Sequence, residues 1–485
     1  MIIRKAGTMK LKYLIYIFMT ASLTTGAGCK KWLDVSPKTQ VRERDLFETE
    51  DGFKDALIGT YQLLSDKKAY GQNLTMGFTD ALAQRYNTLS TSHIFYATAR
   101  YQYTNAAVKT YIKDSWGTLY AGVANVNNIL EQIDNKKTVF SGNSYNIVKG
   151  EALAVRALLH FDLLRLFGGA PIVNANKPSI PYVTTFDKDV YPLLTVNEVI
   201  NNCVADLNAA AELLKADKTI RTVYNDDPFL SYTRNHMNYW AVKGLQARIF
   251  LYKGDKTAAL TAALEVINEG GPQFPFVTPA AAATVSNRDR AYATELLFSI
   301  YAYKLADYAK DYFKTEAANG IPGLYTSTAD LNNLYETANG GSSDLRYLYW
   351  FNSYGSGFST TKYWQDDYSD QESVAQLKGL IPVIRFSEMY YIAAECAATP
   401  AEGVAYLNAV RSKRGISVLS TAISAAGLEA EILKEYKKET YAEGQLFYYF
   451  KRKSTTRIDG SSINMNDATW ILPMPDDEVE FANRF

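Results

Sequence analysis

The segment from Ile147 to Phe167 constrains the fold of this chain more than any other. Ala154, Leu158 and Phe161 recur at intervals of three and four residues, which places them on one face of a helix. A pair of glycines and then a proline follow at once, and together they form a strong stop signal. The pattern predicts a long helix that buries an apolar face and ends at a fixed corner.

Other segments repeat this helical pattern. The face of a preceding helix, which runs to about residue 134, consists of Trp116, Tyr120, Val123 and Asn127. The two helices would form an antiparallel hairpin, and further helices are expected at residues 195–214, 235–253, 384–397, 400–413 and 428–450. Around Gly254, the spacing of Ala247, Phe250 and Ala259 resembles that of tetratricopeptide helix pairs. The sequence therefore predicts an all-α fold of paired helices.

The stretch from residue 270 to 380 has a different composition. It is rich in Gly, Ser, Asn, Tyr and Trp, and its glycines interrupt any extended helix. We interpret it as a loop-rich insert in a helical frame that covers residues 40–269 and 381–485. Residues 70–100 are similar in composition. Long loops on a rigid frame commonly carry binding residues, so the insert is the first candidate for a ligand site.

The N-terminus has the order of a secretory signal. Basic residues come first, the apolar run Tyr13–Leu23 follows, and small residues lead directly to Cys29. The apolar run is shorter than the roughly 20 residues that a membrane-spanning helix needs. Small residues before a cysteine resemble the lipobox of bacterial lipoproteins, although Gly26 stands where that pattern prefers leucine. We expect residues 1–28 to be removed and Cys29 to carry a lipid; the alternative is ordinary secretion without modification.

Composition excludes several classes of function. Lys plus Arg equals Asp plus Glu at 51 each, so the chain lacks the basic field that nucleic-acid binding requires. Its three cysteines cannot build a disulfide framework or a cysteine metal cluster, and its three histidines are far apart in sequence. No zinc or catalytic-triad motif is present in the sequence. We therefore expect neither a metal nor a cofactor.

Several motifs in order resemble the RagB/SusD family of outer-membrane nutrient-uptake lipoproteins. They run from Trp32-Leu33-Asp34 near the cysteine, through Glu151, Arg156 and Phe167-Gly168, to Arg385-Phe386-Ser387-Glu388, Glu443-Gly444 and Leu472-Pro473-Met474-Pro475. The resemblance implies tetratricopeptide-like helix pairs against a loop-rich ligand site. It also implies a lipid-anchored outer-membrane protein that faces outward, captures a glycan or peptide and hands it unaltered to a SusC-like TonB-dependent transporter.

Charged residues in the matched helices are interpreted as fold determinants. Arg385 is expected to be buried with Glu388 and Glu395, and Glu151 with Arg156, because an unpaired buried charge costs several kcal/mol. Asp366 and Asp367 resemble a glycosidase pair only in composition, since neighbouring residues of an extended loop point apart.

An aromatic run in the insert carries the functional hypothesis. Residues 347–368 hold nine aromatic residues without a helical or strand period, interspersed with polar side chains. Sugar rings need aromatic platforms beside polar groups, so the expected ligand-binding residues are Trp350, Trp364, Tyr363, Tyr349 and Tyr354, with Tyr96 and Tyr86 on the opposite wall. Alternatively, the rings fill a small core under a loop. Two other functions stay open, a polysaccharide-acting enzyme and a tetratricopeptide scaffold that binds only protein.

Overall fold

The computed structural model describes residues 43–315, 320, 322–355, 357–366, 368 and 372–484. The chain divides into two units, residues 1–46 and residues 47–485. In the first unit a single short helix, α2 (Glu43–Leu46), lies within the described residues. The expected signal segment and Cys29 lie outside them.

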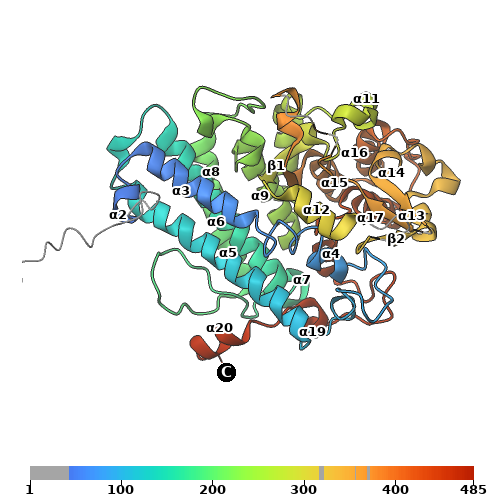
Figure 1. Ribbon diagram of the computed structural model, residues 1–485, viewed down its shortest axis with the longest axis horizontal. Coiled ribbons are helices and arrows are strands. Elements are labelled where there is room, and N and C mark those ends of the chain that lie inside the picture. The colour runs from blue at the N-terminus through green and yellow to red at the C-terminus, as the bar shows by residue number, and fades with distance from the viewer. Residues whose placement is uncertain are drawn as a thin grey trace, which may run out of the picture. The chain divides into compact units, whose positions relative to one another are not determined.

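The first helical block of the second unit consists of long helices that pack on one another in chain order (Figure 1). They are α3 (Glu50–Leu64), α5 (Ala106–Ile133), α6 (Ser144–Phe167), α8 (Val196–Leu214), α9 (Tyr239–Lys253) and α10 (Lys256–Glu265). The helices expected at residues 147–167, 195–214 and 235–253 are therefore present. However, α6 is buried on nearly every side and includes the buried polar residues His160, Asp162 and Arg165.

Local sequence signals fix the ends of these helices. The hydroxyl of Thr195 accepts a hydrogen bond from the backbone nitrogen of Glu198, and the Glu198 carboxylate reaches back to Thr195 in a capping box. At the start of α9, the side chain of Asn238 accepts hydrogen bonds from the backbone nitrogens of Trp240 and Ala241. Gly254 ends α9 with φ +90°, a left-handed conformation that glycine adopts without strain.

The second helical block contains α15 (Phe386–Cys396), α16 (Pro400–Lys413), α17 (Ala425–Glu439) and α18 (Leu446–Arg452). It joins the first block where α15 packs on α9 and α10. Two expectations about this block are wrong. The helix expected at 428–450 is divided between α17 and α18, and the first residues of the segment 384–397 belong to a strand.

Between the blocks, the insert carries two small sheets and several short helices. The strands β1 (Leu296–Tyr301) and β5 (Leu380–Arg385) pair in an antiparallel manner. A second sheet has the order β2 (Thr326–Ser327), β4 (Gly357–Thr360) and β3 (Phe351–Tyr354). The short helices in and around the insert are α11 (Pro279–Ala283), α12 (Leu305–Phe313), α13 (Thr328–Tyr335) and α14 (Leu345–Tyr349). The fold is helical and tetratricopeptide-like, with these sheets as additions.

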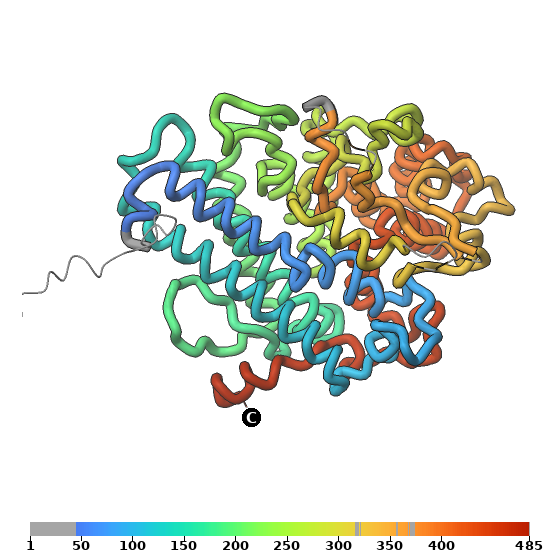
Figure 2. The backbone as a smooth tube through the Cα atoms, in the orientation of Figure 1, coloured from blue at the N-terminus to red at the C-terminus, as the bar shows by residue number. Residues whose placement is uncertain are grey.

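Shorter helices complete the unit. They are α4 (Phe78–Leu82), α7 (Pro171–Asn174), α19 (Asp467–Trp470) and α20 (Asp476–Phe481). The tube in Figure 2 shows the segment around α4 lying beside the C-terminal segment. A hydrogen bond of 3.0 Å from the backbone nitrogen of Gly444 to the carboxylate of Asp80 joins the two regions.

The buried charges are paired, but with other partners than the sequence suggested. Arg385 binds Glu443, not Glu388 and Glu395. Glu388 pairs with Arg248 at 2.6 Å, and Glu395 pairs with Arg452 at 2.7 Å. The reason is that side chains along α15 and at its N-cap face different neighbouring segments. Likewise Arg156 pairs with Asp206, while Glu151 accepts hydrogen bonds from Tyr61 and His236.

Candidate ligand-binding cleft

The two irregular stretches of the sequence lie against each other. The backbone nitrogen of Asn87 donates to the carbonyl of Tyr325 at 2.8 Å. A ring nitrogen of His93 lies 2.9 Å from the carbonyl oxygen of Gly323. Residues 87–93 therefore contact the part of the insert around residues 323–325.

A cavity of about 540 Å³ opens beside this contact, and we call it the polar cleft. Residues 83–89 form one wall, α13 the second, and residues 434–460 the third. Its lining includes Gln84, Asn87, Thr88, Asn333, Lys434 and Asp459. Its volume is within the range of known small-ligand sites, about 300–1,000 Å³.

Positive and negative side chains are balanced in the lining of the polar cleft, with Arg85, Lys434 and Lys437 against Asp330, Glu336 and Asp459. Glu336 lies 2.8 Å from the amino groups of both Lys434 and Lys438, and Asp459 lies 2.5 Å from that of Lys437. Burial favours the neutral acid, but the hydrogen bonds from the two lysines outweigh it and lower the pKa of Glu336. The amides and hydroxyl of the lining thus face a ligand beside compensated charges, an arrangement that suits a neutral polar ligand.

Apolar contact in the polar cleft comes from a few side chains. Leu89 is 79% exposed at the rim. The rings of Tyr86, Tyr441 and Phe450 reach the cleft from the core and are almost entirely buried. The guanidinium of Arg85 lies 4.6 Å from the centre of the Tyr441 ring, which holds this side of the cleft together.

Of the seven aromatic residues expected in the site, Tyr86 lines the polar cleft, with 6% of its surface exposed and its hydroxyl donating to the carbonyl of Met76. Trp350 and Tyr363 are core residues with no exposed surface. Trp350 packs against Val277, Ala282 and Tyr292. The expectation that Trp350 and Tyr363 present open faces to a ligand is therefore wrong, because the loop folds their rings inward.

The other four rings are partly exposed but lie outside the lining of the polar cleft. Tyr349 packs beside the cluster that buries Trp350, and Tyr354 lies at the end of β3. Trp364 has the amino group of Lys314 4.8 Å from its ring centre. The ring of Tyr96 is covered by the guanidinium of Arg100 at 3.6 Å. The aromatic residues that were expected to form one site therefore lie in several separate parts of the structure.

The third wall of the polar cleft, residues 434–460, was missed by the sequence analysis. A signal was available for part of it, since the run from Ser454 to Asn466 is rich in Ser, Thr, Asn, Asp and Gly, as loops are. Its position relative to residues 83–89 depends on long-range contacts. The carbonyl of Lys437, for example, accepts a hydrogen bond from Arg85.

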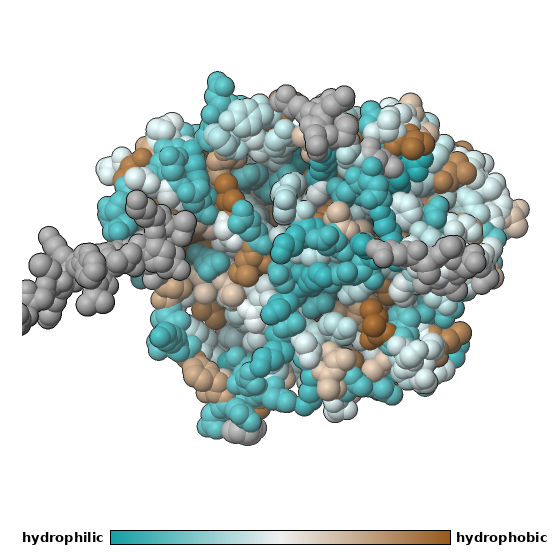
Figure 3. Space-filling model, in the orientation of Figure 1, coloured by the Kyte–Doolittle hydropathy of each residue, from teal (hydrophilic) through white to brown (hydrophobic). Residues whose placement is uncertain are grey.

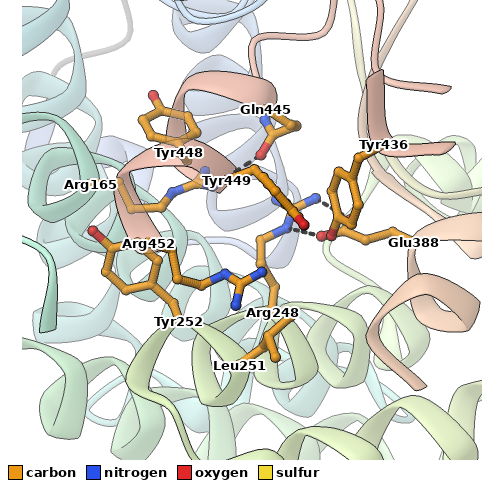
Figure 4. A pocket seen from close by; sticks show the side chains of 10 residues that line it. All are labelled: Arg165, Arg248, Leu251, Tyr252, Glu388, Tyr436, Gln445, Tyr448, Tyr449 and Arg452. Atoms are coloured by element: carbon orange, nitrogen blue, oxygen red, sulfur yellow. Dashed lines mark hydrogen bonds and ion pairs between the residues drawn. The ribbon is translucent and has the colours of Figure 1, made fainter. Parts of the chain in front are cut away.

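A smaller cavity lies deeper in the helical frame, between α9, α15 and α18 (Figure 4). It measures about 30 Å³, enough for water but not for a sugar ring. Arg248 and Glu388 form an ion pair across it, and Arg165 donates to Gln445. We interpret this cavity as part of the packing of the frame.

Among the described residues, no group of three or more His, Cys, Asp or Glu side chains is arranged to hold a metal ion. None of the helices in the described part of the chain has the length and apolarity to cross a membrane.

On the face shown in Figure 3, hydrophobic residues form small separate groups among hydrophilic ones.

Sequence comparison assigns the chain to a known family. Residues 31–251 match a family model described as "Starch-binding associating with outer membrane", and residues 348–473 match the model of the SusD family. The chain belongs to the SusD family. The SusD-like protein P25 of Formosa agariphila is 23% identical over 62% of the chain, and the SusD-like protein P38 is 23% identical over 57%. These matches span about half of each relative, 53% and 48% of their lengths.

Solved structures support the same fold for this SusD-family chain. A SusD superfamily protein of Bacteroides thetaiotaomicron is 22% identical and superposes with a TM-score of 0.69, covering 90% of this chain and 98% of that one. A SusD-like carbohydrate binding protein of Bacteroides vulgatus gives a TM-score of 0.68 at 19% identity, over 90% and 97% of the two chains. At such identities the likeness establishes the fold.

Proposed function

We propose that this protein captures an oligosaccharide in the polar cleft at the outer membrane and passes it, chemically unchanged, to a SusC-like TonB-dependent transporter. The observation that carries the proposal is the lining of the cleft, which combines amide and hydroxyl groups with a balanced number of positive and negative side chains. Sugar hydroxyls donate and accept hydrogen bonds, so they pair well with amides. The outer-membrane setting and the transporter partner are drawn from the family to which the chain belongs.

The charges of the polar cleft argue against catalysis. Glycosidic cleavage needs a carboxylic acid that keeps its proton near neutral pH beside a second carboxylate. Glu336 has a lowered pKa and two lysine partners, which is the opposite of what a general acid requires. In the insert, Asp366 pairs with Lys314, while Asp367 lies outside the described residues.

A peptide is the second ligand class that suits the polar cleft. Peptide groups also pair with amides, and the abundance of tyrosine in the chain suits either ligand. We favour the oligosaccharide because a family model that matches residues 31–251 is described as starch-binding, and because two similar structures are named as carbohydrate- or sugar-binding proteins.

The test is binding of an oligosaccharide panel to variants of the cleft, measured by calorimetry. Asn333 is exposed on α13 and lines the cleft, so Asn333→Ala removes hydrogen-bonding groups without opening the core. Losing one or two hydrogen bonds of about 1 kcal/mol each weakens binding by about five- to thirtyfold. Leu89→Ala is expected to weaken binding through lost apolar contact.

Matched controls lie outside the cleft. Asn339 is exposed in the same region, and Leu348 is 47% exposed, but neither lines the cleft. Asn339→Ala and Leu348→Ala should bind as the parent does. If all four variants bind equally, the polar cleft is not the site; if oligopeptides bind and sugars do not, the ligand class is wrong. Release of shorter sugars during incubation would establish an enzyme instead.

A further inference from the structure

A second cavity of about 350 Å³ shares no lining residue with the polar cleft. We call it the tyrosine pocket, and its defining residues are Tyr61, Gln62, Tyr232, Asn235, His236 and Tyr301. They come from α3, from the loop before α9 and from the end of β1. Nothing in the proposed function uses this pocket.

The walls of the tyrosine pocket are held together by direct contacts. The Ser299 hydroxyl of β1 donates to the side-chain oxygen of Asn235 at 2.8 Å. The ring of Tyr61 lies 6.1 Å from that of Phe298, which joins α3 to the same strand. Tyr232 adopts φ +50°, a left-handed conformation that is unfavourable for a non-glycine residue. Such strain is commonly found where a side chain is positioned for function.

The buried carboxylate of Glu151 fixes the orientation of two side chains that line the tyrosine pocket, Tyr61 and His236. Glu151 accepts hydrogen bonds from the Tyr61 hydroxyl at 2.8 Å and from Nδ1 of His236 at 2.9 Å. Because a carboxylate only accepts, the hydrogen of a neutral His236 ring is on Nδ1. The opposite nitrogen, Nε2, has no hydrogen-bond partner within the described ranges of the chain. His236 therefore contributes a fixed hydrogen-bonding group to the pocket.

The remaining lining of the pocket combines aromatic rings and amides with the side chain of Lys378. Tyr301 is 48% exposed, and Tyr232 is partly exposed. The oxygen of the Asn235 amide is occupied by Ser299, which leaves its NH2 group for a ligand, and Gln62 is exposed at the rim. Aromatic faces beside hydrogen-bond donors and acceptors match a sugar ring, which has apolar C–H faces and a rim of hydroxyls.

We propose that the tyrosine pocket is a second carbohydrate site, which holds one or two neutral sugar rings independently of the polar cleft. In this arrangement Tyr301 covers one face of the ring, while His236 and Asn235 bind its hydroxyls. The inference rests on the proposed function for the ligand class, carbohydrate, but not for the place of binding. A chain with two separated sites can hold one long glycan at two points or two short ones at once.

The test measures stoichiometry and affinity for glucose, galactose and their disaccharides by calorimetry. The key variant is Tyr301→Ala, and the control is Tyr303→Ala, since Tyr303 is 86% exposed two residues away and does not line the pocket. We expect two binding events per chain. Tyr301→Ala should weaken one of them about tenfold or more, while Tyr303→Ala leaves both unchanged.

The cleft variant Asn333→Ala separates this inference from the proposed function. If Asn333→Ala weakens one event and Tyr301→Ala the other, both proposals stand. A single event that depends on Asn333 and not on Tyr301 overturns the second site while the proposed function survives. An event that depends on Tyr301 alone supports the tyrosine pocket and overturns the polar cleft. Binding of tripeptides but no sugar to the pocket overturns the assigned ligand class.

Discussion

Trp350 and Trp364 belong to one aromatic run, yet their rings have different surroundings. Trp350 has no exposed surface, with the ring of Tyr292 at 4.7 Å and the amino group of Lys362 at 3.7 Å from its ring centre. Trp364 is partly exposed and has Lys314 beside it. Truncating the first ring therefore opens a cavity in the core, whereas truncating the second mainly uncovers a surface.

We predict that Trp350→Ala lowers the free energy of unfolding by about 3–5 kcal/mol, the usual cost of removing a core aromatic ring. Trp364→Ala should cost less than half as much, because no closed cavity forms around the partly exposed ring. Urea unfolding of the two variants beside the parent measures both values. Equal losses for the two variants would contradict this assignment of core and surface.

Nothing within residues 347–368 distinguishes these two tryptophans. Burial of Trp350 depends on Val277 and Tyr292, which lie far away in sequence and reach the ring only in the folded chain. The composition of the run was consistent with both a binding surface and a small core, and in the structure some of its rings are buried while others are partly exposed. Of the seven aromatic residues named from the sequence, only Tyr86 lines the polar cleft, and the assignment of the others to a ligand site stays a prediction.

At the scale of elements, helices with local end signals were the most predictable. Thr195, Asn238 and Gly254 act through contacts a few residues away, so their roles can be read without the fold. The strand β5 was not predicted because a short apolar run is equally consistent with a buried strand and the start of a helix. The break between α17 and α18 depends on a distant contact.

That contact is at Gly444, which adopts φ +69°. A Cβ atom there would lie 2.2 Å from the carbonyl oxygen of Leu74 and 2.5 Å from the hydroxyl of Thr79. The glycine thus allows the turn before α18 to approach the segment that leads to residues 83–89. The geometry of the polar cleft depends on this close approach.

We predict that Gly444→Ala destabilises the chain by more than about 3 kcal/mol, through both backbone strain and the clash with Leu74. Gly254→Ala is the matched control, because Gly254 has φ +90° but no atom within 4 Å of an added Cβ. It should cost only about 1 kcal/mol. Chemical denaturation gives both numbers, and similar losses would show that the contact with Leu74 is unimportant.

At the scale of the whole molecule, the proposed ligand sites and the proposed lipid attachment fall in different parts of the sequence. The polar cleft and the tyrosine pocket lie within residues 47–485. The proposed lipid site, Cys29, precedes this unit and follows an apolar run and small residues. Since the residues that line the cleft, from Ala83 to Gly460, are separate in sequence from Cys29, binding and attachment should be separable by mutation.

We predict that Cys29→Ala moves the protein from the membrane fraction to the soluble fraction, while the purified variant binds oligosaccharide with the affinity of the parent. The reason is that acyl chains on a cysteine attach a protein through burial of about 0.8 kcal/mol per CH2 group, which the variant loses entirely. Cys396→Ala is the control, since Cys396 is a partly buried free thiol in α15 and should leave the distribution unchanged. Fractionation followed by immunoblotting measures the distribution, and calorimetry measures the affinity. Retention of Cys29→Ala at the membrane would refute lipid attachment through this residue, whereas release together with lost affinity would refute the independence of the two functions.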